Sequence, residues 1–173
     1  EAGAHHYRLV GLEIASKAGS YNQGLVVLGS AYEKSTSELP HSIEIDRCYI
    51  HGDPKAGGKR GISLNSGSAR ITNSWISDFK STWQDTQAIG GWNGTGPYVI
   101  QNNHLEATGE AVGFGGAIPS ISGVIPSDIY IFGNHFYKPL SWKKDHPSYA
   151  GVAWMVKNHL EFKVGRRIWV VGN

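Results

Sequence analysis

The sequence predicts an all-β protein folded as a right-handed parallel β-helix, a solenoid in which the chain winds through successive coils. Two observations carry this prediction. A short pattern of apolar and small residues recurs along the chain, and a second apolar segment follows nearly every copy of it. A third observation is composition, since 23 glycines among 173 residues, with turn formers scattered throughout, indicate many short strands joined by many turns.

The recurring pattern reads apolar, any residue, apolar, two of any kind, a small or amide residue, any residue, and apolar. Its copies are residues 7–14, 43–50, 69–76, 98–105, 129–136 and 168–173. Superposition of these copies produces one aliphatic column, formed by Leu9, Ile45, Ile71, Ile100, Ile131 and Val170. Strands of successive coils stack about 4.8 Å apart with like residues over one another, so such columns are expected to form a continuous core.

A second column contains small and amide residues. Its members are Leu12, Cys48, Ser74, Asn103, Asn134 and Asn173, and they are separated by 36, 26, 29, 31 and 39 residues. Unequal spacing of this kind fits coils whose strands keep register while their loops differ in length. The amides are expected to hydrogen-bond along the stack and to satisfy the backbone at a sharp bend.

A further strand is predicted in each coil after a short turn. The segments are residues 25–28, 61–64, 87–90, 111–114 and 152–156. Residues 156–163 have a composition compatible with a helix, but the surrounding pattern favours strand. The competing all-β fold is an antiparallel sandwich, which is less favoured because the hairpin signal Asn-Gly occurs only once, at Asn93-Gly94.

Segments 102–107, 129–136 and 168–173 resemble the right-handed parallel β-helix domains of bacterial pectin-lyase-like proteins, and the resemblance covers nearly the whole chain. It implies a secreted or cell-surface bacterial protein that is associated with glycans. The polygalacturonase motifs of this family (an Asp-Asp pair, Gly-His-Gly and Arg-Ile-Lys) are absent, as is the proline-interrupted arginine motif of pectate lyases. No lyase or glycosidase motif is therefore recognisable, and enzymatic activity is left open.

The chain is expected to form a single β-helix domain over residues 1–173, with about six coils and no separate domain or linker. The first copy of the repeat begins within six residues of Glu1, and the last stops at Asn173. We therefore expect a fragment with open coil ends, and we expect one such end to pair with a second copy in a homodimer.

Composition argues against several kinds of partner. The net charge is +2 without a dense Lys/Arg stripe, so nucleic acid is not expected. No apolar run reaches the length needed to span a bilayer, and no membrane partner is expected. The single cysteine, Cys48, is expected to be a buried thiol, and no metal or cofactor is predicted.

Acidic residues of the middle coils are the catalytic candidates, namely Asp85, Glu106 and Glu110. Arg60, Gln87 and Glu110 precede equivalent strand positions and are expected to stack on one face, with Asp85 near the same edge. Two carboxylates could hydrolyse a sugar, or could bind calcium and neutralise a uronate while a basic residue abstracts a proton. The alternative, which we favour, is that they are turn and rim residues. The basic candidates are Lys157, Lys163, Arg166 and Arg167.

Six tryptophans are many for this length. Trp83, Trp92 and Trp142 are the candidates for sugar stacking, because Trp83 and Trp92 flank a polar, glycine-rich stretch. Of the other three, Trp154 is expected to be core, and Trp75 and Trp169 are expected to fill columns between coils.

His104 and His135 occupy the same position in successive coils. A third ligand from this column would have to be Trp75 or Tyr49, which do not bind metals. Stacked surface rings are therefore predicted there, rather than a metal site.

The sequence is compatible with three functions. The one favoured is a structural, self-associating β-helix fragment of an extracellular glycan-associated protein. The alternatives are a polysaccharide lyase or hydrolase and a carbohydrate-binding module.

Overall fold

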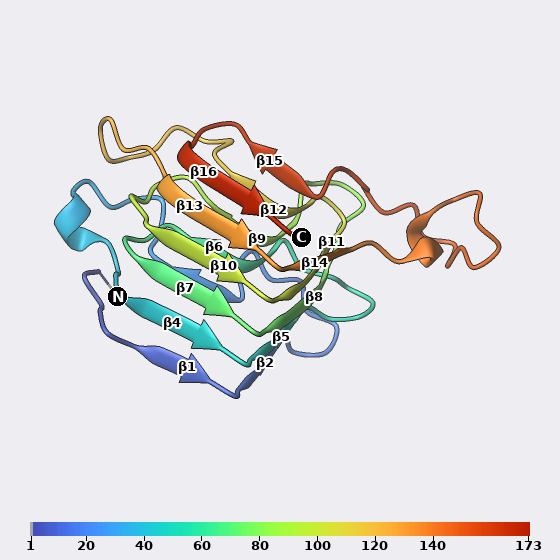
Figure 1. The fold of residues 1–173 in the computed structure, drawn as a ribbon. Helices are drawn as coiled ribbons and strands as arrows, with labels where there is room; N and C mark the ends of the chain where they lie inside the picture. The colour runs from blue at the N-terminus through green and yellow to red at the C-terminus, as the bar shows by residue number, and fades with distance from the viewer. Residues whose placement is uncertain (1) are drawn as a thin grey trace.

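The computed structural model describes residues 2–173 and contains three parallel sheets wound into a stack of coils (Figure 1). The first sheet has six strands, in the order β1 (Arg8–Val10), β4 (Ile43–Asp46), β7 (Ala69–Thr72), β10 (Tyr98–Gln101), β13 (Ser127–Phe132) and β16 (Arg166–Val171). The second sheet contains β2 (Glu13–Ala15), β5 (Tyr49–His51), β8 (Trp75–Phe79), β11 (His104–Ala107) and β14 (His135–Tyr137). The third contains β3 (Val26–Leu28), β6 (Arg60–Leu64), β9 (Gln87–Gly91), β12 (Glu110–Phe114) and β15 (Leu160–Phe162).

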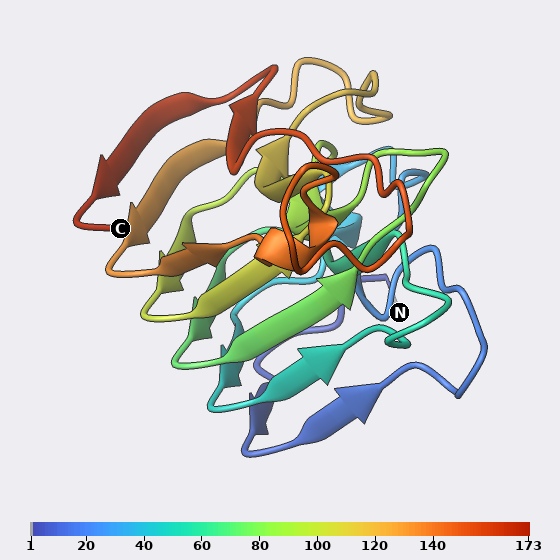
Figure 2. The same ribbon diagram turned by 90° about the vertical axis from the view of Figure 1, so that its right-hand side faces the viewer.

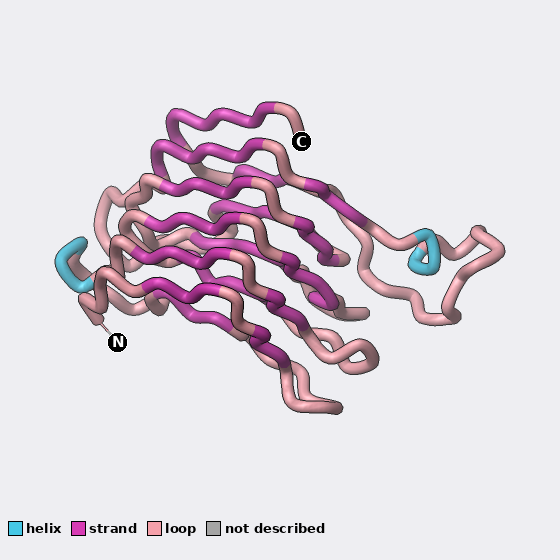
Figure 3. The backbone as a smooth tube through the Cα atoms, turned by 60° about the horizontal axis from the view of Figure 1, so that its bottom comes forward, coloured by secondary structure: helices cyan, strands magenta, loops and turns pink. Residues whose placement is uncertain are grey.

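Every strand pair in the three sheets is parallel, and neighbours in a sheet come from successive coils (Figure 2). The predicted parallel β-helix is confirmed, and the antiparallel sandwich is excluded. Two short 3-10 helices, η1 (Thr36–Glu38) and η2 (Leu140–Trp142), lie in loops outside the stack (Figure 3). In the part of the chain described, no helix has the length and apolar character needed to cross a membrane.

The predicted aliphatic column lies in register at the centre of the first sheet. Ile71 pairs with Ile45 on one side and Ile100 on the other, and Ile100 pairs with Ile131. These four isoleucine side chains are fully buried. Alternate side chains of each strand point inward, so one column from each sheet meets the others in a continuous core.

The predicted amide ladder closes the bend between the first and second sheets. Oδ1 of Asn103 accepts a hydrogen bond from the backbone N–H of Ser74 at 2.9 Å, and Oδ1 of Asn134 accepts one from the N–H of Asn103 at 3.0 Å. Asn173 repeats the contact to the N–H of Asn134 at 3.0 Å. Each amide nitrogen also donates to a carbonyl of the first sheet, such as that of Ile71 for Asn103. The ladder satisfies buried backbone groups that the turn of the chain leaves without strand partners.

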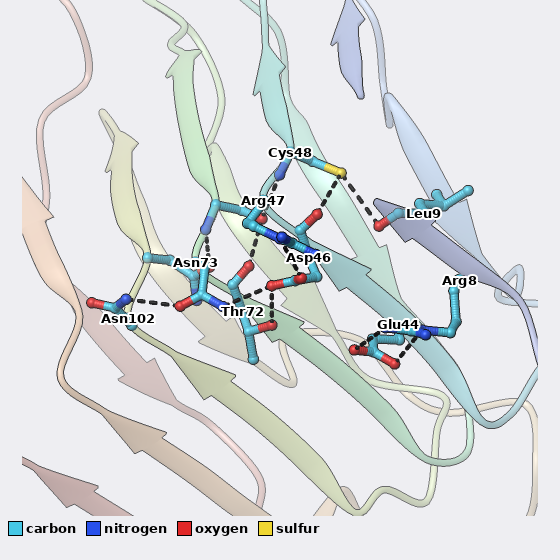
Figure 4. Close-up of polar contacts among 11 residues, drawn as sticks. Arg8, Leu9, Glu44, Asp46, Arg47, Cys48, Thr72, Asn73 and Asn102 are labelled. Carbon is cyan, nitrogen blue, oxygen red and sulfur yellow. Dashed lines mark hydrogen bonds and ion pairs between the residues drawn. The ribbon is translucent and has the colours of Figure 1, made fainter. Parts of the chain in front are cut away.

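The residue immediately before each ladder position has a left-handed backbone conformation. These residues are Gly11, Arg47, Asn73, Asn102, Gly133 and Gly172, with φ between 52° and 66°. Side chains at the non-glycine positions form a second, outer row of contacts (Figure 4). Asn73 donates to Asp46 at 2.7 Å, and Asn102 donates to Asn73 at 2.8 Å. Asparagine tolerates this conformation better than most residues, which explains its place beside the ladder.

One predicted strand is wrong. Residues 152–156 form no strand, and the partner of β12 is instead β15, in which Phe162 pairs with Phe114. The segment belongs to a long excursion between β14 and β15 that projects from the stack (orange in Figure 1). Trp154, expected in the core, is half-buried in this excursion with the Lys80 ammonium 5.5 Å from its ring centroid.

Candidate functional site

A polar column runs across the outer face of the third sheet. Arg60, Gln87 and Glu110 are register partners on β6, β9 and β12, so the prediction that they stack on one face is confirmed. Nε and a terminal nitrogen of Arg60 both donate to Oε1 of Gln87, at 3.0 and 2.7 Å. Nε2 of Gln87 in turn donates to Oε2 of Glu110 at 2.7 Å. The glutamine therefore links a cation and an anion that do not touch one another.

Glu110 also belongs to a group of carboxylates gathered around one lysine. Nζ of Lys157 lies 2.8 Å from Oε1 of Glu110, 2.9 Å from Oδ2 of Asp85 and 3.9 Å from Oε2 of Glu161. Lys163 approaches Glu161 from the other side, at 3.4 Å. The structure thus brings together the sequence candidates Asp85 and Glu110, and adds Glu161, which the sequence did not indicate. We call Asp85, Glu110, Glu161 and Lys157 the carboxylate cage.

The ammonium and the carboxylates of the cage stabilise one another's ionised forms. Burial by itself raises the pKa of Glu110, but contacts with Lys157 and Gln87 outweigh it and hold this pKa below its usual value. The Lys157 pKa is raised well above its ordinary value by Glu110 and then by Asp85. Glu110 is therefore ionised and Lys157 protonated at neutral pH.

Glycines form the floor beside the polar column. Gly90 and Gly113 are register partners on β9 and β12. A Cβ atom at Gly90 would lie 3.1 Å from Nε of Arg60, and one at Gly113 would lie 3.4 Å from Cγ of Gln87. With no side chain at either position, the floor stays open next to Gln87.

The column, the three carboxylates of the cage and Gly113 line a hollow of about 220 Å³, which we call the groove. It is lined by Lys59, Arg60, Gln84, Asp85, Gln87, Gly91, Trp92, Glu110, Gly113, Phe114, Gly115, Gly116, Glu161 and Lys163. Small-molecule sites are typically concave and combine aromatic surface with a few convergent polar groups, as this one does.

Arg60 places a half-buried positive charge in the groove. Its guanidinium lies 5.1 Å from the ring centroid of Trp92 and is half-buried. Burial lowers its pKa, with Glu110 acting in the opposite direction. Among residues 2–173, no carboxylate lies within ion-pair distance of Arg60. A partly desolvated guanidinium without a carboxylate partner has the chemistry to bind an anionic group.

The third catalytic candidate, Glu106, lies apart from the cage. It is on β11 of the second sheet, where its Oε1 accepts a long hydrogen bond of 3.4 Å from the N–H of Asp78. Burial and then the charge of Asp78 raise the pKa of Glu106. Nearby Lys138 donates to the carbonyls of three consecutive residues, 107–109, and so secures the turn between β11 and β12. The structure thus places Glu106 outside the carboxylate cage, on a different sheet from Glu110.

The three tryptophan candidates lie in different environments. Trp92 lines the groove, and Trp83 is 63% exposed with its ring 5.8 Å from that of Tyr21. Trp142 is only 7% exposed, because it lies in η2 and packs within the excursion, so its ring is not presented to solvent. Of the three, only Trp92 contributes to the groove.

The two tryptophans expected to fill columns between coils stack on rings of neighbouring coils, on the outer surface. Trp75 is 51% exposed and lies parallel to His104 at 3.7 Å, while Trp169 stacks on Tyr130 at 4.7 Å. Each stacked contact covers one face of these rings, and both tryptophans remain about half exposed.

The two histidines are register partners, as predicted. Their Nδ1 atoms are 3.0 Å apart, and Trp75 continues the stack beyond His104. Within residues 2–173, no group of three or more His, Cys, Asp or Glu side chains is arranged to hold a metal ion. Of the basic candidates, Arg167 pairs with Asp128 away from the groove, Lys163 lines the groove, and Lys157 contacts the groove carboxylates Asp85 and Glu110.

No protein-family model, no curated protein and no solved structure matches the chain.

Proposed function

We propose that the chain is a β-helix module of an extracellular, pectin-lyase-like bacterial protein, and that its groove binds an acidic polysaccharide without cleaving it. The observation that carries the proposal is Arg60, a half-buried guanidinium that faces the groove with no carboxylate partner among the described residues. A uronate or another acidic sugar would supply the missing anion.

The surroundings of Arg60 suit a sugar chain. The glycine floor at Gly90 and Gly113 leaves room for a ring to lie against the sheet. Gln87 and Glu110 offer groups for hydroxyl hydrogen bonds, and Trp92 offers an amphipathic ring at one wall. Lys59 and Lys163 add positive charge at the rim.

The state of the carboxylates favours binding over cleavage. Glycoside hydrolysis needs one carboxylic acid that is protonated and one carboxylate that is free to attack or to activate water. Asp85 and Glu110 are both paired with Lys157, and the pKa of Glu110 is lowered. Neither group is therefore poised as the acid. A lyase or hydrolase remains the alternative, and release of unsaturated or reducing ends from a polyuronate would establish it.

Calorimetric titration with oligogalacturonates and with neutral oligosaccharides of equal length tests the proposal. We expect binding of the acidic series only. Arg60→Gln and Trp92→Ala should each weaken it about tenfold or more, as loss of a desolvated charge contact or an aromatic contact predicts. Trp75→Ala is the matched control, because this ring lies on the second sheet against His104, and its affinity should equal that of the unmodified protein. Equal affinity for neutral and acidic sugars, or no effect of either groove substitution, would refute the proposal.

A further inference from the structure

A chain of hydrogen bonds with a fixed direction runs along the polar column. Nε and one terminal nitrogen of Arg60 donate to Oε1 of Gln87 at 3.0 and 2.7 Å, and Nε2 of Gln87 donates to Oε2 of Glu110 at 2.7 Å. We infer that Gln87 determines the preference of the groove for anionic ligands, because it holds the Arg60 guanidinium in place without neutralising its charge. The inference deepens the proposed function and rests on it for the identity of the ligand.

The two neighbours of Gln87 force the direction of its amide. A guanidinium has only donors, and an ionised carboxylate has only acceptors. Glu110 is ionised at neutral pH, since burial, which raises its pKa, is outweighed by the contacts with Lys157 and Gln87. Only an amide with its oxygen toward Arg60 and its nitrogen toward Glu110 satisfies both neighbours. Gln87 is 9% exposed, so water has little access to replace either partner.

The contact with Gln87 uses one edge of the guanidinium and leaves the donors of another edge for a ligand. Arginine carries five N–H groups in a planar fork. One N–H on Nε and one on a terminal nitrogen of Arg60 go to Gln87. Within residues 2–173, no side chain or backbone group accepts a hydrogen bond from the other three. The two terminal nitrogens form the edge that binds a carboxylate in bidentate fashion, and Arg60 lines the groove.

A glutamate at position 87 would reverse this effect once it is ionised. While it carries a proton, its hydroxyl can donate to Glu110 and its carbonyl oxygen can accept from Arg60, which copies the amide. Loss of that proton places a carboxylate against the guanidinium and neutralises it. The charged groups around this pair are Lys59 and Arg60 at one end of the column, and Asp85, Lys138, Lys157 and Glu161 around Glu110. The affinity of such a variant for anions therefore falls as the pH rises.

Calorimetric titration of Gln87→Glu and Gln87→Met with oligogalacturonate tests the inference. At pH 8, Gln87→Glu should weaken binding about tenfold or more, because the external carboxylate must displace an internal one. The loss should be smaller at pH 5, whereas the unmodified protein should bind about equally at the two pH values. Gln87→Met keeps an unbranched side chain and adds no charge, so it should lose less affinity and still prefer acidic to neutral oligosaccharides.

Gln84→Glu is the matched control for added charge. Gln84 also lines the groove, but its Nε2 donates to the Tyr21 hydroxyl at 2.8 Å. The substitution adds the same charge to the groove without placing it on the hydrogen-bonded partner of Arg60, so it should cost less affinity at pH 8 than Gln87→Glu. The inference is overturned if Gln87→Glu binds as tightly as the unmodified protein at pH 8, or if Gln87→Met or Gln84→Glu matches its loss.

A measurement on Arg60 itself separates this inference from the proposed function. The NMR resonance of its Cζ atom reports on the guanidinium, and sodium sulfate at pH 8 is a small anion that needs no glycan. Sulfate should shift this resonance in the unmodified protein and in Gln87→Met, and much less in Gln87→Glu. That pattern without oligogalacturonate binding would remove the proposed function and keep the role of Gln87. Equal shifts in the two variants would overturn the role of Gln87.

Discussion

Asn103 shows how much of the fold depends on one amide side chain. Its Oδ1 accepts from the N–H of Ser74, and its Nδ2 donates to the carbonyl of Ile71 and to Oδ1 of Asn134. Only 2% of the residue is exposed, so water cannot replace these partners. One side chain therefore serves backbone groups in the preceding coil and a side chain in the following one.

Removal of this amide should be strongly destabilising. Asn103→Ala leaves the N–H of Ser74 and the carbonyl of Ile71 buried without these partners, and we expect a loss of about 3 kcal/mol in the free energy of unfolding. Urea denaturation measures it. Asn102→Gly is the control, because Asn102 is exposed and glycine accepts its φ of 52°. A loss at position 103 no larger than that at position 102 would show that the ladder contributes little.

At the scale of the strand, neighbouring glycines of β9 have different roles. A Cβ at Gly91 would overlap the carbonyl oxygen of Leu64 on β6, where the backbone has no room to yield. A Cβ at Gly90 would meet the side chains of Arg60 and Gln87, which can move. The first glycine thus permits close approach of the coils, and the second keeps the groove floor open.

Alanine substitution should separate these roles. Gly91→Ala is expected to lose about 2–3 kcal/mol of stability, since overpacking against the backbone shifts β9 away from β6. Gly90→Ala should keep nearly all of its stability and lose oligogalacturonate affinity. Parallel urea denaturation and calorimetric titration of the two variants check this, and the reverse assignment would contradict it.

Strands were predictable from the sequence wherever the coil repeat governs them. The inward alternation of the first sheet fixes the register of Ile45, Ile71 and Ile100, and the strand pattern of the third sheet places Gln87 beside Glu110. The half of the groove that belongs to β6, β9 and β12 follows from that register.

The other half of the groove depends on loops, whose paths the repeat does not determine. Lys157 reaches Glu110 from the excursion between β14 and β15, 47 residues further along the chain. The apolar residues 152–156 in that excursion have the sequence pattern of a strand. Hydrogen bonds to other loops hold the segment instead, such as the one from the N–H of Met155 to the carbonyl of Ser81. The burial of Trp142 has the same origin, because a local pattern does not reveal how a long loop folds back on itself.

For the molecule as a whole, the parallel sheets leave edges at both ends of the stack. Strands β1 and β16 each have a partner on one side only within the described chain. Unpaired strand edges are templates for pairing with another chain. Val171, on β16, adds exposed apolar surface at one of these edges.

We propose that the chain pairs with a second copy through the edge of a strand, as a homodimer at micromolar concentration. Sedimentation velocity over a concentration series measures it. If the β16 edge forms the contact, Val171→Lys should shift the equilibrium toward monomer, and Lys163→Met, in the groove, should not. A monomer mass throughout the series would count against end-to-end pairing.

The ladder at the bend also gives the stack a polarity. Each buried N–H donates to a side chain of the coil that follows, from Ser74 to Asn103, from Asn103 to Asn134 and from Asn134 to Asn173. A coil removed from the start would take its own donor with it and leave every later acceptor in place. A coil removed from the far end would strip the acceptor from a donor that stays behind. Truncation at the far end thus leaves a backbone N–H without its acceptor, whereas truncation at the start leaves an amide side chain without its backbone carbonyl, and the two directions are not equivalent.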